Sequence, residues 1–416
     1  MRKQVLILSD LFPPQFAPRI QAVVKYLPEY GWEPIVVTEL IRSEAKYAHQ
    51  ATDSSFQEHC PVHRIDLGAK REGTLGHKGN FALNLLFEEK ERRMEQKVRI
   101  LFPHKPDAIL CFAYRKFPLR TAAKLAREWG IPWIADCRDI VEQYTNGDFL
   151  PRQVTFMGWP MHCLMQLIRR RIINQRNRYL RQAHKVTTVS PWHKEVLSVI
   201  NPDTHLIYNG YDKEVFQVNM RPSPTFDIVY TGRLLSLAMR DPSLLFEGLA
   251  SPALSDLRNS GQLRLRWYTD RQSEELLRPL IKEFNLMGIN SFHSMIPREE
   301  MAQMIQSASI LLQLSNRETE NGPHGMVSTK IFEAMAVRKP VLLVRSDEAV
   351  MEDLIQDTHI GCAARHVGQV IDFVLNCYKE WKENGYTKVV GNGRRIAQFS
   401  RKEQVADFAR LLDSLS

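Results

Sequence analysis

The sequence predicts an α/β protein with two doubly wound parallel sheets in tandem. Short apolar runs typical of strands alternate with helical patterns along the whole chain, in two successive series. The chain has 416 residues, which is too many for one compact core, so two domains of about 200 residues each are expected. Ligands of such sheets bind at the carboxyl ends of the strands.

The first series contains five predicted strands and at least two helices. After the first strand, Ile20, Val23, Val24 and Leu27 have the spacing of one helix face. A second helix is expected over residues 118–129, where Gly130 would end it. The strands are expected at residues 5–8, 34–38, 107–112, 131–135 and 185–189.

The second series begins after the turn-rich Asn209-Gly210-Tyr211-Asp212, which marks the expected domain boundary. Its strands are expected at residues 227–231, 263–268, 310–314 and 341–344. We therefore divide the chain into a first domain at 1–208, a second at 209–398, and a final helix at 399–416 that packs back on the first domain.

The sequence predicts where in the cell the protein is found and the redox state of its cysteines. No apolar run approaches the roughly 18 to 20 residues that cross a bilayer, and the N-terminus has no signal-peptide cleavage pattern, so a cytoplasmic protein is expected. The six cysteines are scattered, without a Cys-x-x-Cys pair. Reduced thiols are expected, and neither a zinc site nor a disulfide framework.

The net charge of +9 comes from one stretch. Residues 149–194 contain no Asp or Glu, and their first half is apolar. Such a sequence suits an anionic membrane interface, although a core helix with a basic outer face would look the same. Nucleic acid binding is not expected, because no recognition motif accompanies the charge. The basic residues of this stretch are Arg152, Arg169, Arg170, Arg171, Arg176, Arg178, Arg181, Lys185 and Lys194.

The segment from Gly325 to Val344 predicts a helix that could bind a nucleotide. Ser328 and Thr329 are residue types that begin helices, and the free N–H groups of a helix start favour phosphate. Glu333 lies about 7 Å further along the axis, where its two oxygens could accept hydrogen bonds from a ribose. An ordinary α/β helix that carries one Glu is the alternative.

Two common cofactor sites and one metal site are not supported. No Gly-x-Gly-x-x-Gly fingerprint follows a predicted strand, and no Walker lysine loop is present. No two aspartates are separated by a single residue, so a metal site built on an Asp-x-Asp pair is not expected.

Four motifs in order give the chain a family resemblance over essentially its whole length. It resembles retaining glycosyltransferases of the GT-B fold, and is similar to family 4, in which two Rossmann-like domains face a cleft. The motifs are Phe12-Pro13-Pro14 with Arg19, Asn209-Gly210-Tyr211-Asp212 before Phe216, Gly232-Arg233 with Arg240, and Ser328-Thr329-Lys330-Ile331-Phe332-Glu333.

The resemblance implies a role for each matching residue. Arg233 and Arg240 would stabilise the departing diphosphate without a metal or other cofactor, and Arg138 and Asp139 are further catalytic candidates. A surface position for Arg233, a helix-flanking position for Arg240 and an internal salt bridge for Asp136, Arg138 and Asp139 are the alternatives. Arg19 and Asp136 would bind the acceptor, and the donor would contact Val327, Ser328, Thr329, Lys330 and Glu333.

Two positions depart from the family pattern. A Glu often stands eight residues before the ribose Glu, and here that position is Gly325. A histidine commonly follows the strand that corresponds to residues 131–135, whereas this chain has Asp136-Cys137-Arg138-Asp139. We interpret the second departure as a variant that some relatives share.

The expected function is metal-independent transfer of a sugar, with retention, from a nucleoside diphosphate sugar to a lipid-linked or polysaccharide-precursor acceptor. In the front-face mechanism that the resemblance implies, the leaving phosphate itself takes the acceptor proton. The protein would be cytoplasmic and peripheral on the inner face of the cell membrane. A non-catalytic nucleotide-sugar-binding protein and a sugar-nucleotide epimerase of the same fold are the alternatives.

Overall fold

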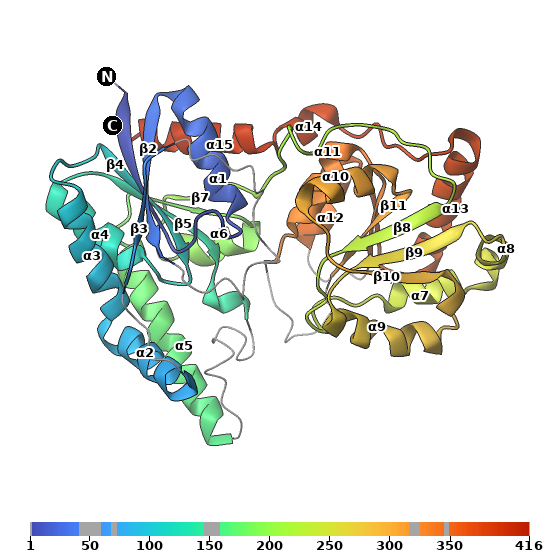
Figure 1. Cartoon of the computed structure of the whole chain (residues 1–416), viewed down its shortest axis with the longest axis horizontal. Coiled ribbons are helices and arrows are strands. Elements are labelled where there is room, and N and C mark those ends of the chain that lie inside the picture. Colours follow the sequence, from blue (N-terminus) through green and yellow to red (C-terminus); the bar gives the residue numbers. More distant parts are fainter. Residues whose placement is uncertain are drawn as a thin grey trace. The chain divides into compact units, whose positions relative to one another are not determined.

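The chain forms two compact units, each built around one parallel sheet (Figure 1). The computed structural model describes residues 2–40, 60–67, 73–144, 159–315, 325–344 and 349–415. One unit comprises Met1–Tyr208, His324–Met326 and Lys402–Ser416, and the other comprises Asn209–Pro323 and Val327–Arg401.

The N-terminal unit has a seven-stranded sheet in which all pairings are parallel, in the order β3-β2-β1-β4-β5-β6-β7. The strand order reverses between β1 and β4, which is where doubly wound sheets bind ligands. The strands are β1 (Lys3–Ser9), β2 (Trp32–Glu39), β3 (Val62–Ile65), β4 (Ala108–Tyr114), β5 (Trp133–Asp139), β6 (Lys185–Thr188) and β7 (Thr204–Leu206).

Helices cover both faces of this sheet (Figure 1). Because successive strand residues point to opposite faces, Val5 and Ile7 join one buried cluster and Leu6 and Leu8 join the other. The helices are α1 (Pro18–Tyr26), η1 (Leu27–Tyr30), α2 (Gly73–Phe87), α3 (Glu89–Leu101), α4 (Leu119–Trp129), η4 (Val141–Gln143), α5 (Trp159–Leu180), α6 (Pro191–Ser198) and α15 (Arg401–Asp413). Val405, Phe408 and Leu412 of α15 lie in the cluster that contains Ile7.

The C-terminal unit has a six-stranded parallel sheet in the order β10-β9-β8-β11-β12-β13. Its strands are β8 (Phe226–Thr231), β9 (Leu263–Tyr268), β10 (Asn290–His293), β11 (Ile310–Leu314), β12 (Val341–Val344) and β13 (Gly361–Ala364). Its helices are α7 (Ser243–Ala250), η7 (Pro252–Leu254), α8 (Ser255–Asn259), α9 (Arg271–Glu283), η8 (Met287–Ile289), α10 (Arg298–Ser307), α11 (Thr329–Val337), α12 (Ala349–Thr358), α13 (Val367–Asn384) and α14 (Gly393–Ala397).

The predicted fold class is confirmed, and all nine predicted strands are present. The strands that the sequence did not predict are β3, β7, β10 and β13. In the described part of the chain these are the four edge strands of the two sheets. Each has only three or four residues and lacks the apolar run of a strand buried on both faces.

The contact between α3 and α4 contains a buried carboxyl. Glu91 is 2% exposed, and its Oε2 accepts a hydrogen bond of 3.2 Å from the Thr121 backbone N–H. Burial raises the pKa of Glu91 to about 8; Lys116 works against this and Glu88 adds to it. The carboxyl is therefore mostly protonated at neutral pH, and ionising it opposes folding.

We expect Glu91→Gln to stabilise the protein increasingly as the pH rises. Protonation favours the folded state because the folded pKa is raised, so this contribution is complete below the unfolded value and is lost as the pH passes through about 8. Gln stays neutral throughout. Relative to the parent, the variant should gain on the order of 2 to 4 kcal/mol between pH 5 and pH 9. Urea unfolding at the two pH values measures this gain.

Glu128→Gln is the matched control in the neighbouring helix. A hydrogen bond from Arg99 lowers the pKa of Glu128, so its carboxylate favours folding when ionised. Its replacement should lower stability at high pH, opposite in sign to the effect of Glu91→Gln. A stability difference between Glu91→Gln and the parent that does not change with pH would contradict the assignment.

Candidate active site

In the C-terminal unit, the turn after β8 brings three predicted donor-site cations together. Gly232 follows β8 with a φ of +102°, and its N–H donates to the Tyr268 carbonyl at 2.8 Å. A Cβ at Gly232 would lie 2.5 Å from Lys330 Nζ, so only glycine allows both the backbone conformation and this approach. The turn and the first residues of α11 are therefore in direct contact.

Lys330 is a partly buried cation in a positive environment. Its Nζ lies 4.7 Å from the centroid of the Tyr230 ring, and no described residue forms an ion pair with it. Burial lowers the pKa of Lys330 to about 7, and Arg240 lowers it further, whereas Glu333 raises it. A bound anion would supply the negative charge that the site lacks.

Arg233 and Arg240 complete the cluster. Arg233 Nε lies 3.2 Å from Asp270 Oδ2, and the side chain is 39% exposed. Arg240 donates through Nη1 to the Arg233 carbonyl oxygen, and the Tyr230 hydroxyl donates to the same oxygen at 3.0 Å. Arg240 therefore contacts the turn that carries Arg233. A charge that only flanks a helix, the alternative interpretation, would not require this contact.

Helix α11 begins as the sequence predicts. Ser328 is its N-cap residue, with an extended φ and ψ of −67° and 130°, and its side chain makes no capping hydrogen bond. Lys330 lies in the first turn of α11, and its side chain contacts the turn at Gly232. The free N–H groups at the start of the helix and the Lys330 amine are therefore part of the same positively polarised region. Val327, Thr329 and Glu333 are partly buried, and their contacts with a donor remain predictions.

In the N-terminal unit, Arg19 and Asp136 pair with one another. Arg19 Nη2 and Nε donate to the two oxygens of Asp136 at 2.9 and 3.1 Å, and Thr187 Oγ1 donates to Oδ1 at 2.7 Å. Asp136 is completely buried. The internal salt bridge that the sequence left open is therefore what these residues form, and acceptor binding by either one remains a prediction.

Arg138 and Asp139 lie at the carboxyl end of β5. Arg138 Nη2 is 3.5 Å from Asp10 Oδ1, at the end of β1, so the ion-pair alternative holds for Arg138. Burial raises the pKa of Asp10 in spite of this arginine. Asp139 is partly buried. Burial lowers the pKa of the nearby His193 of α6 to about 4, and the charge of Asp139 opposes this shift. A direct role of Arg138 or Asp139 in catalysis remains a prediction.

His193 is a buried polar residue near Asp139 that sequence reasoning did not single out. It is 2% exposed, and neither ring nitrogen has a hydrogen-bond partner among the described residues. Ser190, the N-cap of α6, accepts from the His193 backbone N–H at 3.2 Å, so the helix start fixes its position. A single histidine after a strand gives no sequence signal, because only the tertiary contacts show that it is buried without a partner.

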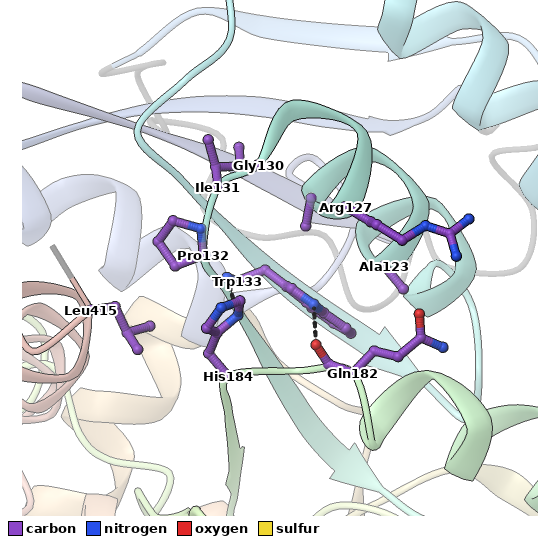
Figure 2. Close-up of a pocket in the computed structure, with 10 residues that line it drawn as sticks. Ala123, Arg127, Gly130, Ile131, Pro132, Trp133, Gln182, His184 and Leu415 are labelled. Atoms are coloured by element: carbon purple, nitrogen blue, oxygen red, sulfur yellow. Dashed lines mark hydrogen bonds between the residues drawn. The ribbon is translucent and has the colours of Figure 1, made fainter.

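A cavity of about 530 Å³ lies at the opposite edge of the N-terminal sheet (Figure 2). Trp133 Nε1 donates to the Gln182 carbonyl at 2.9 Å there, and His184 Nδ1 accepts from the Trp133 N–H at 3.3 Å. The cavity lies at the amino ends of β5 and β6, away from the predicted site residues. Its lining consists of Ala123, Ala126, Arg127, Gly130, Ile131, Pro132, Trp133, Gln182, His184 and Leu415.

Comparison with known families agrees with this arrangement. Residues 16–210 match the family described as Glycosyl transferase 4-like domain. The N-terminal unit is therefore similar to a glycosyltransferase 4-like domain. No match was found among curated proteins.

Solved structures establish the GT-B fold of this chain. It is similar to sucrose-phosphate synthase from Thermosynechococcus elongatus, with a TM-score of 0.62 and 15% identity over 99% of both chains. It is similar to Anabaena Alr3699/HepE in complex with UDP and glucose, with a TM-score of 0.61 and 17% identity over 99% of this chain and 100% of that one. The lipopolysaccharide outer core galactosyltransferase WaaB has a TM-score of 0.58 and 13% identity over 99% of both chains.

We expect the binding of a nucleoside diphosphate to be coupled to proton uptake at Lys330. Between pH 7 and 10 the unliganded amine is largely neutral, and a diphosphate beside it would favour the charged form. At pH 8.5, binding to the parent should therefore take up close to one proton, and affinity should fall as the pH rises above 7. Calorimetry in buffers of different ionisation enthalpy measures the uptake.

Lys330→Arg is the matched variant, since a guanidinium stays charged over this range. It should bind the nucleoside diphosphate with almost no proton uptake and with little dependence of affinity on pH. Equal proton uptake by Lys330→Arg and the parent would show that another group titrates.

Proposed function

We propose that this glycosyltransferase moves a sugar, with retention and without a metal, from a nucleoside diphosphate sugar to a lipid-linked or polysaccharide-precursor acceptor. The observation that carries the proposal is the cation cluster of Arg233, Arg240 and Lys330 against the start of α11. In glycosyl transfer, negative charge develops on the departing diphosphate as the sugar becomes oxocarbenium-like. Groups already fixed around that charge stabilise the transition state more than the bound donor.

The similar structures support a nucleotide-sugar donor. The solved HepE complex contains UDP and glucose, and WaaB is named as a galactosyltransferase of the lipopolysaccharide outer core. We therefore propose a uridine nucleotide as the first donor to test, and a membrane-associated saccharide as the acceptor.

A surface formed by α2 and α5 supports peripheral membrane binding. The two helices lie side by side (Figure 1). Arg171 donates to the Leu85 and Leu86 carbonyls, and Gln175 donates to the Leu85 carbonyl. On the outside, apolar side chains are exposed near basic ones, as in proteins that bind anionic interfaces. This α2–α5 surface consists of Leu83, Leu86, Phe87, Leu164, Leu167, Arg170 and Arg171.

The basic stretch contains both buried and exposed arginines. Arg176 is completely buried and forms two hydrogen bonds with Glu142, and Arg169 donates to the Glu142 carbonyl. These two arginines, with Arg171, hold α5 against its neighbours. Arg170 and Arg178 are exposed. Arg152 and the apolar Phe156 and Met157 lie outside the described residues.

The described residues contain no helix that is long and apolar enough to cross a membrane. We propose membrane contact through the α2–α5 surface. Location in the cytoplasm, on the inner face of the cell membrane, is part of the same proposal.

A donor panel tests the activity. The protein is incubated with UDP-, GDP-, ADP- and dTDP-sugars, with and without a chelator, and the products are separated. Slow release of sugar and nucleoside diphosphate that the chelator does not affect is expected. A changed sugar on an intact donor would indicate an epimerase, and binding without turnover a non-catalytic binding protein. Loss of turnover on chelation, restored by magnesium or manganese, would contradict the metal-free proposal.

Arg240→Ala should lower kcat about 100-fold with a smaller change in KM, because its charge matters most as the diphosphate departs. Arg271→Ala is the control, since Arg271 is 91% exposed in the same unit and pairs with Glu275 in the next turn of its helix. Steady-state kinetics with the best donor compares the two variants. An equal kcat for Arg240→Ala and the parent would remove this residue from the mechanism.

Membrane binding is tested on the α2–α5 surface by replacing Leu167 and Arg170 with Gln. Both side chains are exposed, and Leu167 is 61% exposed, so folding should be unaffected. A basic residue at an anionic surface contributes about 1 kcal/mol, and the loss of the leucine adds to this. Sedimentation with anionic vesicles should fall at least about 5-fold, while UDP binding is retained.

Arg178→Gln is the charge-matched control, because Arg178 is exposed two turns further along α5. It should bind vesicles almost as the parent does. Unchanged sedimentation of the Leu167 and Arg170 double variant, or equal binding to neutral lipid, would return this surface to a purely structural role.

A further inference from the structure

The cavity at the amino ends of β5 and β6 is large enough for a small organic ligand. Its volume of about 530 Å³ lies within the range of about 300 to 1,000 Å³ found for ligand pockets, and is many times the roughly 30 Å³ that one water molecule occupies. Its walls belong entirely to the N-terminal unit (Figure 2). The predicted site residues Asp136, Arg138 and Asp139 lie toward the other end of β5, so the proposed function does not explain this space.

The lining of the cavity is mostly apolar and is held in place by the core. Ala123, Ala126 and Ile131 are buried. Trp133 is 1% exposed, and both of its N–H groups are hydrogen-bonded. Leu415 is partly buried and packs against the buried cluster that contains residues of α15. The apolar part of a ligand would therefore enter a space that is already formed.

Arg127 supplies a positive charge to the cavity. Its side chain is exposed, and no residue in the described part of the chain pairs with it. The adjacent Glu128 is engaged elsewhere, because Arg99 Nε donates to its two carboxylate oxygens at 3.0 and 2.9 Å. The guanidinium of Arg127 is therefore available to an anionic ligand.

The end of α4 opposes an anion less than Arg127 favours one. The C-terminus of a helix carries about half a negative charge. Here the Gly130 N–H donates to the Ala126 carbonyl, and Lys105 Nζ donates to the Trp129 carbonyl at 3.1 Å, so part of that charge is already offset. Because the full charge of the Arg127 guanidinium exceeds the remainder, a negatively charged head group is favoured.

We propose that this cavity binds a small, water-soluble amphipathic carboxylate, whose head group pairs with Arg127 and whose apolar body extends past Trp133 toward Leu415. A guanidinium offers two parallel N–H donors, which match the two oxygens of a carboxylate. Figure 2 shows Arg127 on one side of Trp133 and Leu415 on the other, so an elongated ligand can reach both. The site is independent of the proposed donor.

The position of the cavity favours a ligand from solution over a membrane lipid. Leu167 of the α2–α5 surface and Leu180, the last residue of α5, are about 20 Å apart along the helix axis. The cavity lies beyond Leu180, where Gln182 lines it. A lipid held by the α2–α5 surface would have to leave the bilayer over this distance to fill the cavity.

The test titrates the full chain with octanoate and with octanamide, its uncharged analogue, by calorimetry. The parent should bind octanoate about 10-fold more tightly than octanamide, because only octanoate forms a hydrogen-bonded charge pair. Arg127→Gln should bind octanoate about 10-fold more weakly than the parent and bind octanamide unchanged, which also shows that the variant is folded. The absence of octanoate binding by the parent, or equal affinities of the parent for both probes, would overturn the proposal.

Lys124→Gln is the matched control. It removes the same charge from α4, and Lys124 does not line the cavity. This variant should bind both probes as the parent does. An equal loss of octanoate affinity in Lys124→Gln and Arg127→Gln would show a general effect of charge and would overturn the site.

Leu415→Ala tests the apolar end of the cavity. Because it removes apolar contact and no charge, it should weaken octanoate and octanamide by the same factor, about 3-fold. Unchanged affinity for both probes would overturn the placement of the apolar body.

Competition distinguishes this site from the others that we propose. Neither UDP nor anionic vesicles should displace octanoate from the parent, whatever the donor panel shows. Displacement by UDP would place octanoate in the donor site, and displacement by vesicles would indicate a lipid ligand. Either result would overturn the proposal of a separate site for a soluble carboxylate and leave the proposed function intact.

Discussion

The buried ion pair between Arg19 and Asp136 holds together the carboxyl edge of the N-terminal sheet. Arg19 comes from α1, Asp136 from β5, and the same guanidinium donates to the Tyr208 carbonyl at 2.8 Å and lies 5.0 Å from the centroid of the Phe408 ring. Two charges removed from water are stable only when fully hydrogen-bonded, and Thr187 supplies the additional bond. Arg138 and Asp139 follow Asp136 at this end of β5.

The C-terminal unit, by contrast, contains buried positive charge that is not fully paired in the described part of the chain. Around Gly232, Lys330 and Arg240 are brought together without compensating acids of equal number among the described residues, and the pKa of Lys330 falls because burial and a like charge disfavour its ammonium form. Without a bound anion, such a cluster does not stabilise the folded protein. A bound anion would offset the cost of removing these cations from water. The cluster therefore supports a diphosphate site more strongly than the helix start alone.

The sequence by itself determined the fold class, the nine interior strands and the helix start at Ser328, because buried strands and helix faces leave periodic apolar patterns. Only the tertiary structure decided the four edge strands, whose side chains are not buried on both faces and so carry no such pattern. It also decided that Arg19 pairs with Asp136 and Arg171 with the carbonyls of α2, and that His193 is buried without a partner among the described residues. These are contacts between residues distant in the chain, and a local pattern cannot encode them.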